Sequence, residues 1–378
     1  MDYAGALAYL DSHVNLEVSP SAAARRLDRM HRLVGLMGDP QAAYPVIHLT
    51  GTNGKGSTAR ILTSLLIQQG LSVGTYTSPH LERINERLAW NGAPISDDEF
   101  TEVIEAVATL EPFVDDDSGA GPPTHFEILT AAAYRWFADI AVDVAVIEVG
   151  LGGRWDATNV ADGGVAVVTN VSLDHRATIG PELIDIAREK AGIVKPGSTL
   201  VSGVADPELA ATFAAAAPAR IWTRDEDFGW TVNRLAHGGR VLGLFTPGAQ
   251  YENVVLPLHG SYQGDNAAAA LAAAEAFFTR PLDSDVVTDA LQSVTVPGRL
   301  EVMGRNPLCV LDGAHNQAGA AAAATALAEA FAGVSDRVLV VGMVSGREPA
   351  EMLRALDVER ARLVVACPPP SPRALPPG

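Results

Sequence analysis

A glycine-rich segment at residues 51–57 has the residue types that bind phosphate. It lies between an apolar, strand-like run (Pro45 to Thr50) and a helix-like run (Thr58 to Gln69). Glycines let a backbone curl so that its N–H groups and a helix N-terminus face one anion. Lys55 adds a mobile positive charge, and Ser57 or Thr58 adds a hydroxyl suited to Mg2+. The segment therefore predicts a nucleoside triphosphate site formed by Gly51, Thr52, Asn53, Gly54, Lys55, Gly56 and Ser57.

This loop is a short variant of the P-loop pattern. The full pattern has four residues between its two glycines, whereas only two separate Gly51 from Gly54 here. A strand-to-helix turn with a purely structural role is the alternative. That alternative leaves the lysine and the hydroxyl that follow the two glycines without a function.

An acidic residue, Glu148, follows the apolar run that begins at Val142, and glycines come directly after it. A carboxylate at the carboxyl end of a buried strand, beside a phosphate loop, can hold Mg2+ directly or through water. Asp156 and Asn159 follow closely, which favours a metal site. The alternative is an acid that ends a strand in solvent.

A second polar cluster follows the next strand-like run and contains Asn170, Asp174 and His175. A histidine alone is more often an ordinary surface or core residue. Beside an acid and just past a strand end, His175 becomes a candidate metal neighbour. Lys190 lies in a helix-like turn with other charged residues, a pattern that alone indicates only a solvated or ion-paired side chain.

Apolar β-branched runs alternate with Ala- and Leu-rich helical runs, which is typical of parallel α/β architecture. A capping box at Ser96 and Glu99 predicts a helix that ends before Pro112, and a second helix should end at Gly192. The expected strands are Val46 to Thr50, Ser72 to Thr77, Val142 to Val149, Val165 to Asn170 and Leu200 to Val204.

The alternation of strand-like and helix-like runs begins again around residues 297–299, which predicts a second α/β unit. We expect an ATP-binding domain with its N-terminal segment at 1–296 and a smaller, Rossmann-like domain at 297–378. The expected elements of the second are a strand at Leu308 to Leu311, a helix at Gln317 to Phe331, a strand at Arg337 to Val341, a helix at Ala350 to Leu356 and a strand at Leu363 to Ala366. Because no helix follows the last strand, we expect this domain to be truncated at its C-terminus.

Composition narrows the class of protein. A length of 378 residues suits two domains, and no run is long and apolar enough for a membrane span. The N-terminus lacks a secretory pattern, and Cys309 and Cys367 form no disulfide framework, so we expect a cytoplasmic protein. A net charge of -18 argues against nucleic acid as a partner. We expect a monomer.

Several short motifs occur together and in order along the chain. They are residues 48–57, Thr-Ser-Pro-His-Leu at 77–81, Asn-Glu-Arg at 85–87, Glu-Val-Gly-Leu-Gly-Gly-Arg at 148–154, Asp-His at 174–175, Glu-Lys-Ala-Gly-Ile at 189–193, Pro-Gly-Arg at 297–299 and Asp-Gly-Ala-His-Asn at 312–316. With these motifs the chain resembles the folylpolyglutamate synthase/dihydrofolate synthase branch of the Mur ligase superfamily.

The resemblance implies a role for each matching position. Lys55 and the loop backbone would hold the ATP phosphates, and Lys190 would be carbamylated, which turns a cation into a metal ligand. Lys55, His175, Lys190 and Arg299 would be catalytic, and His80, Arg83 and Phe126 would line the substrate. The implied ligands of two Mg2+ sites are Ser57, Ser78, Glu148, His175 and Lys190. The implied nucleotide contacts outside the loop are Asn266, Arg299, Asp312 and His315.

The implied reaction is an ATP-dependent amide ligation in folate biosynthesis. A substrate carboxylate would attack the γ-phosphate to give an acyl phosphate, and the amine of L-glutamate would then displace phosphate. Dihydropteroate or a reduced folate would supply the carboxylate, and Phe126 could stack on its ring or belong to the core. The domains would close about Val296-Pro297-Gly298 to exclude water.

Two departures from the branch keep other functions open. Residues 345–349, Ser-Gly-Arg-Glu-Pro, replace a more acidic stretch, and the chain stops at Gly378 where relatives continue. A degenerate protein that binds nucleotide or folate without ligating anything is one alternative. A Mur-type ligase that acts on a UDP-sugar peptide is the other.

Overall fold

An eight-stranded sheet forms the centre of the computed structural model, which describes residues 1–15, 27–114, 121–174, 178–334, 336–346 and 348–376. The strand order is β4-β3-β2-β5-β1-β6-β7-β8. The strands are β1 (Val46–Thr50), β2 (Val73–Tyr76), β3 (Leu88–Trp90), β4 (Ala93–Pro94), β5 (Val144–Glu148), β6 (Gly163–Val168), β7 (Thr199–Ser202) and β8 (Arg220–Thr223).

The six strands from β2 to β8 in this order are parallel, and β3 and β4 add an antiparallel edge. Leu49 of β1 lies opposite Glu148 of β5 and Val167 of β6. The carboxyl ends of these three strands therefore meet at one edge of the sheet. This arrangement confirms the predicted parallel α/β architecture, and ligands in such folds bind at that edge.

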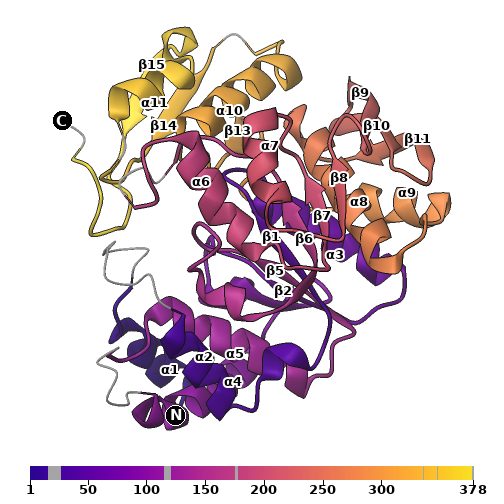
Figure 1. Cartoon of the computed structure of the whole chain (residues 1–378). Coiled ribbons are helices and arrows are strands. Elements are labelled where there is room, and N and C mark those ends of the chain that lie inside the picture. The colour runs from indigo at the N-terminus through magenta and orange to yellow at the C-terminus, as the bar shows by residue number, and fades with distance from the viewer. Residues whose placement is uncertain (16–26, 115–120, 175–177, 335, 347, 377–378) are drawn as a thin grey trace.

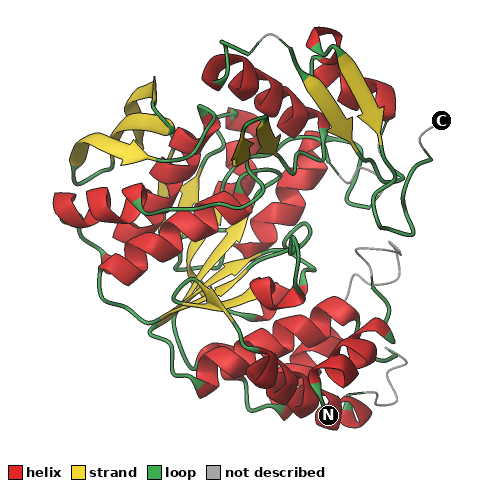
Figure 2. Ribbon diagram, turned by 180° about the vertical axis from the view of Figure 1, so that it is seen from behind, coloured by secondary structure: helices red, strands yellow, loops and turns green. Residues whose placement is uncertain are grey.

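Helices cover both faces of the sheet (Figures 1 and 2). Alternate residues of each strand point to opposite faces. Val165 and Val167 pack with helices α3 (Lys55–Gln68), α8 (Tyr262–Phe278) and α9 (Ser284–Gln292). Ala166 and Val168 pack with α6 (Leu183–Lys190) and α7 (Pro207–Ala214). The other helices of this face are α1 (Tyr3–Asp11), α2 (Asp28–Leu36), α4 (Asp97–Leu110) and α5 (His125–Asp139).

A three-stranded antiparallel sheet lies beside α8 and α9 (Figure 1). Its strands are β9 (Gly229–Ala236), β10 (Gly239–Phe245) and β11 (Gln250–Leu256). The sequence analysis missed this sheet, because β9 exposes several apolar residues and lacks the clear alternation of a half-buried strand. Its hairpin turn contains Gly238 at a φ of 76°.

The described part of the second unit contains two small sheets, two α-helices and a short 3-10 helix at Val358–Arg360. Strands β12 (Glu301–Arg305) and β13 (Leu308–Leu311) pair antiparallel, while β14 (Val338–Val341) and β15 (Leu363–Ala366) pair parallel. Helices α10 (Gln317–Ala330) and α11 (Pro349–Ala355) complete it. The strand predicted at Leu308 to Leu311 is present, but its antiparallel partner β12 was not predicted. In Figure 1 this unit lies at the opposite end of the molecule from α1, α2, α4 and α5.

Local signals placed most helix ends correctly. The side chain of Ser96 accepts from the N–H of Glu99, and the carboxylate of Glu99 accepts from the N–H of Ser96, as in the predicted capping box. Helix α3 begins at Lys55, three residues earlier than predicted. Gly54 has a φ of 84°, so the chain enters this helix directly from the loop. Among the helices that the structure describes, none has the length and hydropathy to cross a membrane.

His48 lies wholly buried in β1, and its Nε2 is 2.8 Å from Thr158 Oγ1. Burial lowers the pKa of His48 to about 3, and the nearby charge of Lys195 acts in the same direction. The folded chain therefore holds this ring neutral throughout the range in which an unfolded histidine becomes protonated.

We predict that His48 makes folding stability fall as the pH decreases. Its contribution is complete above the unfolded pKa of 6.5 and is lost as the pH falls from there towards the folded value of about 3. Between pH 7.5 and pH 5, urea unfolding should show the wild type losing about 2 kcal/mol more than His48→Gln. Equal losses in the two proteins would contradict this account.

Candidate functional site

The loop between β1 and α3 is fixed by contacts with the carboxyl end of β6. The carbonyl of Asn53 accepts from Thr169 Oγ1 at 2.6 Å and from Asn170 Nδ2 at 2.9 Å. The N–H of Asn53 donates to Asn170 Oδ1 at 3.0 Å. A side chain at Gly51 would overlap Thr169 Oγ1. These contacts leave little freedom in the backbone that would cradle a phosphate.

Lys55 opens α3 and folds back over the loop. Its Nζ lies 3.1 Å from the carbonyl oxygen of Gly51. It also donates to the carbonyl of Thr52 at 3.5 Å. An ammonium held by neutral carbonyls can turn to a phosphate oxygen, which is a stronger, charged acceptor. On the other side of the loop, Asn266 of α8 accepts from Thr58 Oγ1 at 3.4 Å and lies directly against Gly54.

Glu148 ends β5 beneath this helix start and is only 3% exposed. Its Oε2 accepts from the N–H of Ser78 at 3.2 Å. Burial raises the pKa of this carboxyl, and the strongest opposing influence is the charge of Lys55. Arg299 and Arg60 also favour the carboxylate form. The carboxylate is a ligand type that a divalent cation such as Mg2+ takes, and the neighbouring cations favour an anion beside it.

Lys190 at the end of α6 brings a second buried charge into the same region. It is 4% exposed, and burial lowers its pKa to about 7, with the charge of Lys55 adding to the effect. The carboxylates of Asp174, Glu189 and Asp156 oppose this shift. Near neutral pH a large fraction of this amine is therefore unprotonated and nucleophilic.

The second unit reaches the loop through the start of α10. Asn316 Nδ2 donates to Asn53 Oδ1 at 3.0 Å and to Asp174 Oδ2 at 2.9 Å. The same side chain caps α10 by accepting from the N–H of Gly319. His315 Nε2 lies 3.7 Å from Asp174 Oδ2 and is half exposed. Residues more than 260 positions apart in the sequence thus meet over the loop.

Arg299 and Asp312 lie together at the junction with the second unit. Asp312 accepts from the N–H of Leu300 at 3.0 Å and from that of Ala314 at 2.8 Å, so its carboxylate fixes this turn. Arg299 Nη1 donates to the carbonyl of Gly298 at 3.2 Å. A side chain at Gly313 would overlap that guanidinium. The charge of Arg299 is close enough to affect Glu148.

The expected substrate residues have other partners in this structure. Arg83 is exposed, pairs with Asp97 at 2.6 Å and lies over the ring of Tyr3. His80 Nδ1 accepts from Arg87 Nε at 3.0 Å. Phe126 is half buried against Tyr76 and leaves no room for a side chain at Gly150. The expected metal neighbour His175 lies outside the described residues.

The structure adds residues to which the sequence analysis gave no role. Thr169 and Asn316 hold the loop from opposite sides, and Arg60 lies one turn beyond Ser57, near Glu148. Ser57 and Arg60 are three residues apart and lie on the same helix, but the helix was predicted to begin only at Thr58, so the spacing gave no signal. The contact between Asn316 and Asn53 had no signal in the sequence, because it depends on how the two units pack.

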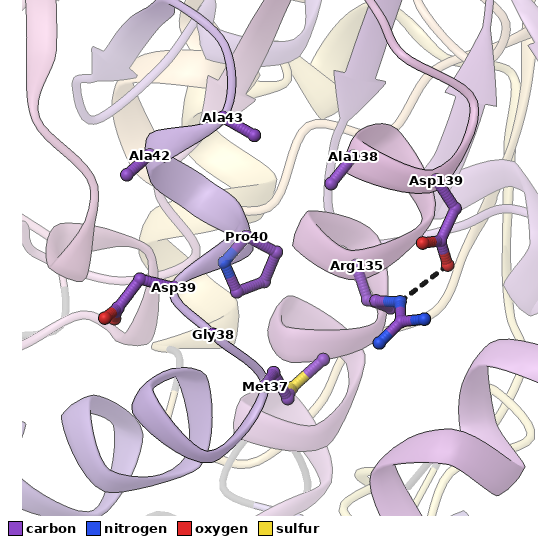
Figure 3. A pocket seen from close by; sticks show the side chains of 9 residues that line it. All are labelled: Met37, Gly38, Asp39, Pro40, Ala42, Ala43, Arg135, Ala138 and Asp139. Atoms are coloured by element: carbon purple, nitrogen blue, oxygen red, sulfur yellow. Dashed lines mark hydrogen bonds and ion pairs between the residues drawn. The ribbon is translucent and has the colours of Figure 1, made fainter.

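A separate cavity of about 410 Å³ lies between the end of α5 and the segment after α2 (Figure 3). Within it Arg135 donates to Asp139 at 2.6 Å. None of its lining residues belongs to the loop, to β5 or to the second unit. The lining residues are Met37, Gly38, Asp39, Pro40, Ala42, Ala43, Arg135, Ala138 and Asp139.

Comparison with known proteins identifies relatives over nearly the whole chain. Residues 49–274 match the Mur ligase middle domain, and residues 298–377 match the Mur ligase glutamate ligase domain. The dihydrofolate synthase/folylpolyglutamate synthase of Mycobacterium tuberculosis is 42% identical over 84% of this chain and 69% of its own length. The folylpolyglutamate synthase of Lacticaseibacillus casei is 35% identical over 100% of this chain and 88% of its own length.

Solved structures agree with these sequence relatives. The folylpolyglutamate synthase of Mycobacterium tuberculosis with ADP and AMPPCP superposes with a TM-score of 0.91 at 38% identity, over 99% of this chain and 84% of that one. An FPGS-AMPPCP-folate complex superposes with a TM-score of 0.83 at 32% identity, over 97% of this chain and 96% of that one.

We predict that Gly54→Ala weakens ATP binding by about tenfold or more, because the added methyl group overlaps Asn266 Oδ1 and must distort the loop. Gly70→Ala is a matched control, since Gly70 has a φ of 86° and open space around its Cα. Both variants carry the same backbone strain. Titration calorimetry with an ATP analogue should find normal affinity in the control alone. Equal affinities in the two variants would contradict the proposed geometry.

Proposed function

The chain belongs to the Mur ligase family as an ATP-dependent ligase of the dihydrofolate and folylpolyglutamate synthase type, and we propose that it joins L-glutamate to the carboxylate of dihydropteroate or of a reduced folate. One observation carries this proposal. The start of α10 is hydrogen-bonded to the phosphate loop through Asn316 and Asn53, so the glutamate ligase domain faces the ATP site. A protein that only bound nucleotide would need no such contact.

In this proposal the loop from Gly51 to Ser57 binds the phosphates of ATP. Backbone N–H groups and the N-terminus of α3 would face the anion, and Lys55 would move from the Gly51 carbonyl to the outer phosphates. Thr52 and Asn53 would act by holding the loop, Thr52 through its hydroxyl contacts with Ser172 and Asn53 through its contacts with Asn170 and Asn316. Asn266, fixed against Gly54 and hydrogen-bonded to Gln263, would lie beside the base.

The residues near Glu148 fit Mg2+. Within the described ranges no three His, Cys, Asp or Glu side chains gather into a closed metal cage. Mg2+ often binds through one or two carboxylates together with substrate phosphates. Glu148 with the hydroxyls of Ser57 and Ser78 would supply the protein's share of a first site. There the ion would neutralise charge on the phosphates during transfer.

A second site would use Lys190 once its amine has combined with CO2, and His175 would be a further ligand. A buried amine with a pKa of about 7 is partly neutral, as that addition requires. The product is an anion suited to a cation, whereas a free ammonium would repel one. The neighbouring charge of Lys55 would stabilise the anion.

The chain's own residues support a reaction in two steps. The carboxylate oxygen of the substrate attacks the γ-phosphorus of ATP, the bond to ADP breaks, and an acyl phosphate forms. Lys55 stabilises the charge on the phosphoryl oxygens during this transfer. The glutamate nitrogen then attacks the carbonyl carbon, phosphate leaves, and the nitrogen loses a proton to form the amide.

The second unit would protect the acyl phosphate from water. We propose domains at 1–296 and 297–378 that close about Val296-Pro297-Gly298. Arg299 would reach the phosphates, His315 would lie beside the reacting groups, and Asp312 would keep its turn in place and face the ribose. Because one chain supplies both sides of this site, we propose that the enzyme acts as a monomer. His80, Arg83 and Phe126 would border the acyl substrate after the groups around them rearrange.

The test of this function follows phosphate and product together. Purified protein is incubated with Mg-ATP and L-glutamate, and either dihydropteroate or reduced folate is added as the acid. With one or both of these acids it should release phosphate and form an equal amount of amide, which mass spectrometry detects. Lys55→Ala should lower the rate by about a hundredfold or more, because it removes charge from the transferring phosphoryl group. ATP binding without amide formation from either acid would refute the ligase and favour a binding protein.

We predict that Lys190→Ala lowers turnover by about a hundredfold or more and that added short carboxylic acids restore part of it. The small acid would occupy the place of the carbamate. Lys190→Arg keeps a positive charge and fills that space, so it should not be rescued. Wild-type protein supplied with isotope-labelled bicarbonate should give a carbamate signal that Lys190→Arg lacks. An unmodified amine in fully active enzyme would rule out the carbamate.

A further inference from the structure

Arg240 of β10 is a buried cation with an unusual set of partners. The residue is only 2% exposed. Its Nη1 donates to Glu329 Oε2 at 2.9 Å and its Nη2 to Glu329 Oε1 at 3.2 Å. Asn233 of β9 completes the set, because its carbonyl accepts from Nη2 at 3.0 Å and its side chain accepts from Nε. A bidentate pair of this kind fixes direction as well as distance.

This pair joins the two units of the chain. Arg240 lies in the part that matches the Mur ligase middle domain, and Glu329 lies in the part that matches the glutamate ligase domain. Two residues after Glu329, the ring of Phe331 packs on that of His259 with centroids 5.1 Å apart. The end of α10 is therefore anchored on the first unit.

The start of the same helix is anchored on the phosphate loop. Asn316 there contacts Asn53 and Asp174, as described above. Helix α10 thus touches the first unit at both of its ends, and a helix of this length is about 20 Å long. A tilt of only about 3° at the Glu329 end would move the other end by about 1 Å.

A second line of contacts runs from Arg240 back to the ATP site. Asn233 Nδ2 donates to the carbonyl of Ser261 at 2.8 Å, and Asn233 leaves no room for a side chain at Gly264. Ser261 precedes α8, which carries Asn266 to Gly54 and Thr58. Helices α10 and α8 with the Arg240 pair therefore form a closed frame around the phosphate loop.

We propose that Arg240 and Glu329 are a positioning pair that holds α10 at the angle needed for ligation, an inference that rests on the function proposed above. Neither side chain would touch the reacting atoms. Their role is to set where Asn316 and His315 lie relative to the loop, and a misplacement of about 1 Å can cost about a hundredfold in rate. Loss of the pair would leave the ATP-binding loop itself intact.

The expected consequence is a leak of the acyl phosphate. If α10 tilts, water can reach the carbonyl before glutamate does. Attack by water returns the free carboxylate and phosphate, so ATP is consumed without amide formation. The ratio of phosphate released to amide formed measures this leak directly, and lower folding stability alone would not change it.

Glu329→Ala and Glu329→Gln test the proposal, with Glu351→Gln as the control. Glu329 is partly exposed, and alanine is a good helix former, so the helix should persist. Glu351 is an exposed acid on α11 of the same unit. In both Glu329 variants kcat should fall, and the KM for glutamate should rise, each by at least about tenfold. The ratio of phosphate released to amide formed should exceed about two, while the affinity for ATP should stay within about twofold of the wild type. The control should match the wild type.

Two results would overturn the proposal. One is a phosphate-to-amide ratio near one in both Glu329 variants, even with a lower unfolding temperature, because the pair would then only stabilise the fold. The other is hydrogen exchange at residues 315–319, the start of α10, that matches the wild type. The exchange measurement needs no turnover. A wild type that forms no amide would therefore refute the proposed function and leave this inference to be decided by exchange.

Discussion

The position of Asn53 is the constraint on which the rest of the site depends. Its backbone is held on one side by Thr169 and Asn170 at the end of β6, and its side chain is held on the other by Asn316 of the second unit. Asn53 therefore fixes the shape of the phosphate loop and also forms a hydrogen bond between the two units. A loop with free backbone N–H groups would bind phosphate in many conformations, and the entropy of ordering it would oppose binding. Here the hydrogen bonds from Thr169 and Asn170 restrict that backbone and lower this entropic cost.

The buried charged groups near the loop affect one another's pKa: the charge of Lys55 acts on both Glu148 and Lys190. Glu148 is buried among cations, and Lys190 is buried beside both Lys55 and several carboxylates. The pKa of Glu148 rises and that of Lys190 falls, and burial is the main cause of both shifts. An added anionic phosphate and a divalent cation would compensate charges that the protein alone leaves poorly matched. We propose on this ground that the site takes a metal-bound nucleotide more readily than either component separately.

The sequence predicted the parts of this architecture that depend on local signals. Strand β1, the glycine loop, the capping box at Ser96 and the acid at the end of β5 each have a short-range cause in turn chemistry or hydrophobic pattern. Strand β9 lacks such a pattern, and the apolar runs of β10 and β11 were not predicted as strands either, nor was the pairing of β12 with β13. The contacts of Asn316 with Asn53 and of Arg240 with Glu329 join distant residues, so only the packing of the two units reveals them.

The central claim is that a carboxylate is activated as an acyl phosphate in the site formed by Lys55 and Glu148. The most direct test uses dihydropteroate or reduced folate with heavy oxygen in its carboxyl group, and measures that label in the phosphate released with Mg-ATP and L-glutamate. The account predicts one labelled oxygen in each phosphate molecule, because the carboxyl oxygen that attacks phosphorus leaves with it. Amide formation with unlabelled phosphate would contradict the acyl phosphate and require another mode of activation.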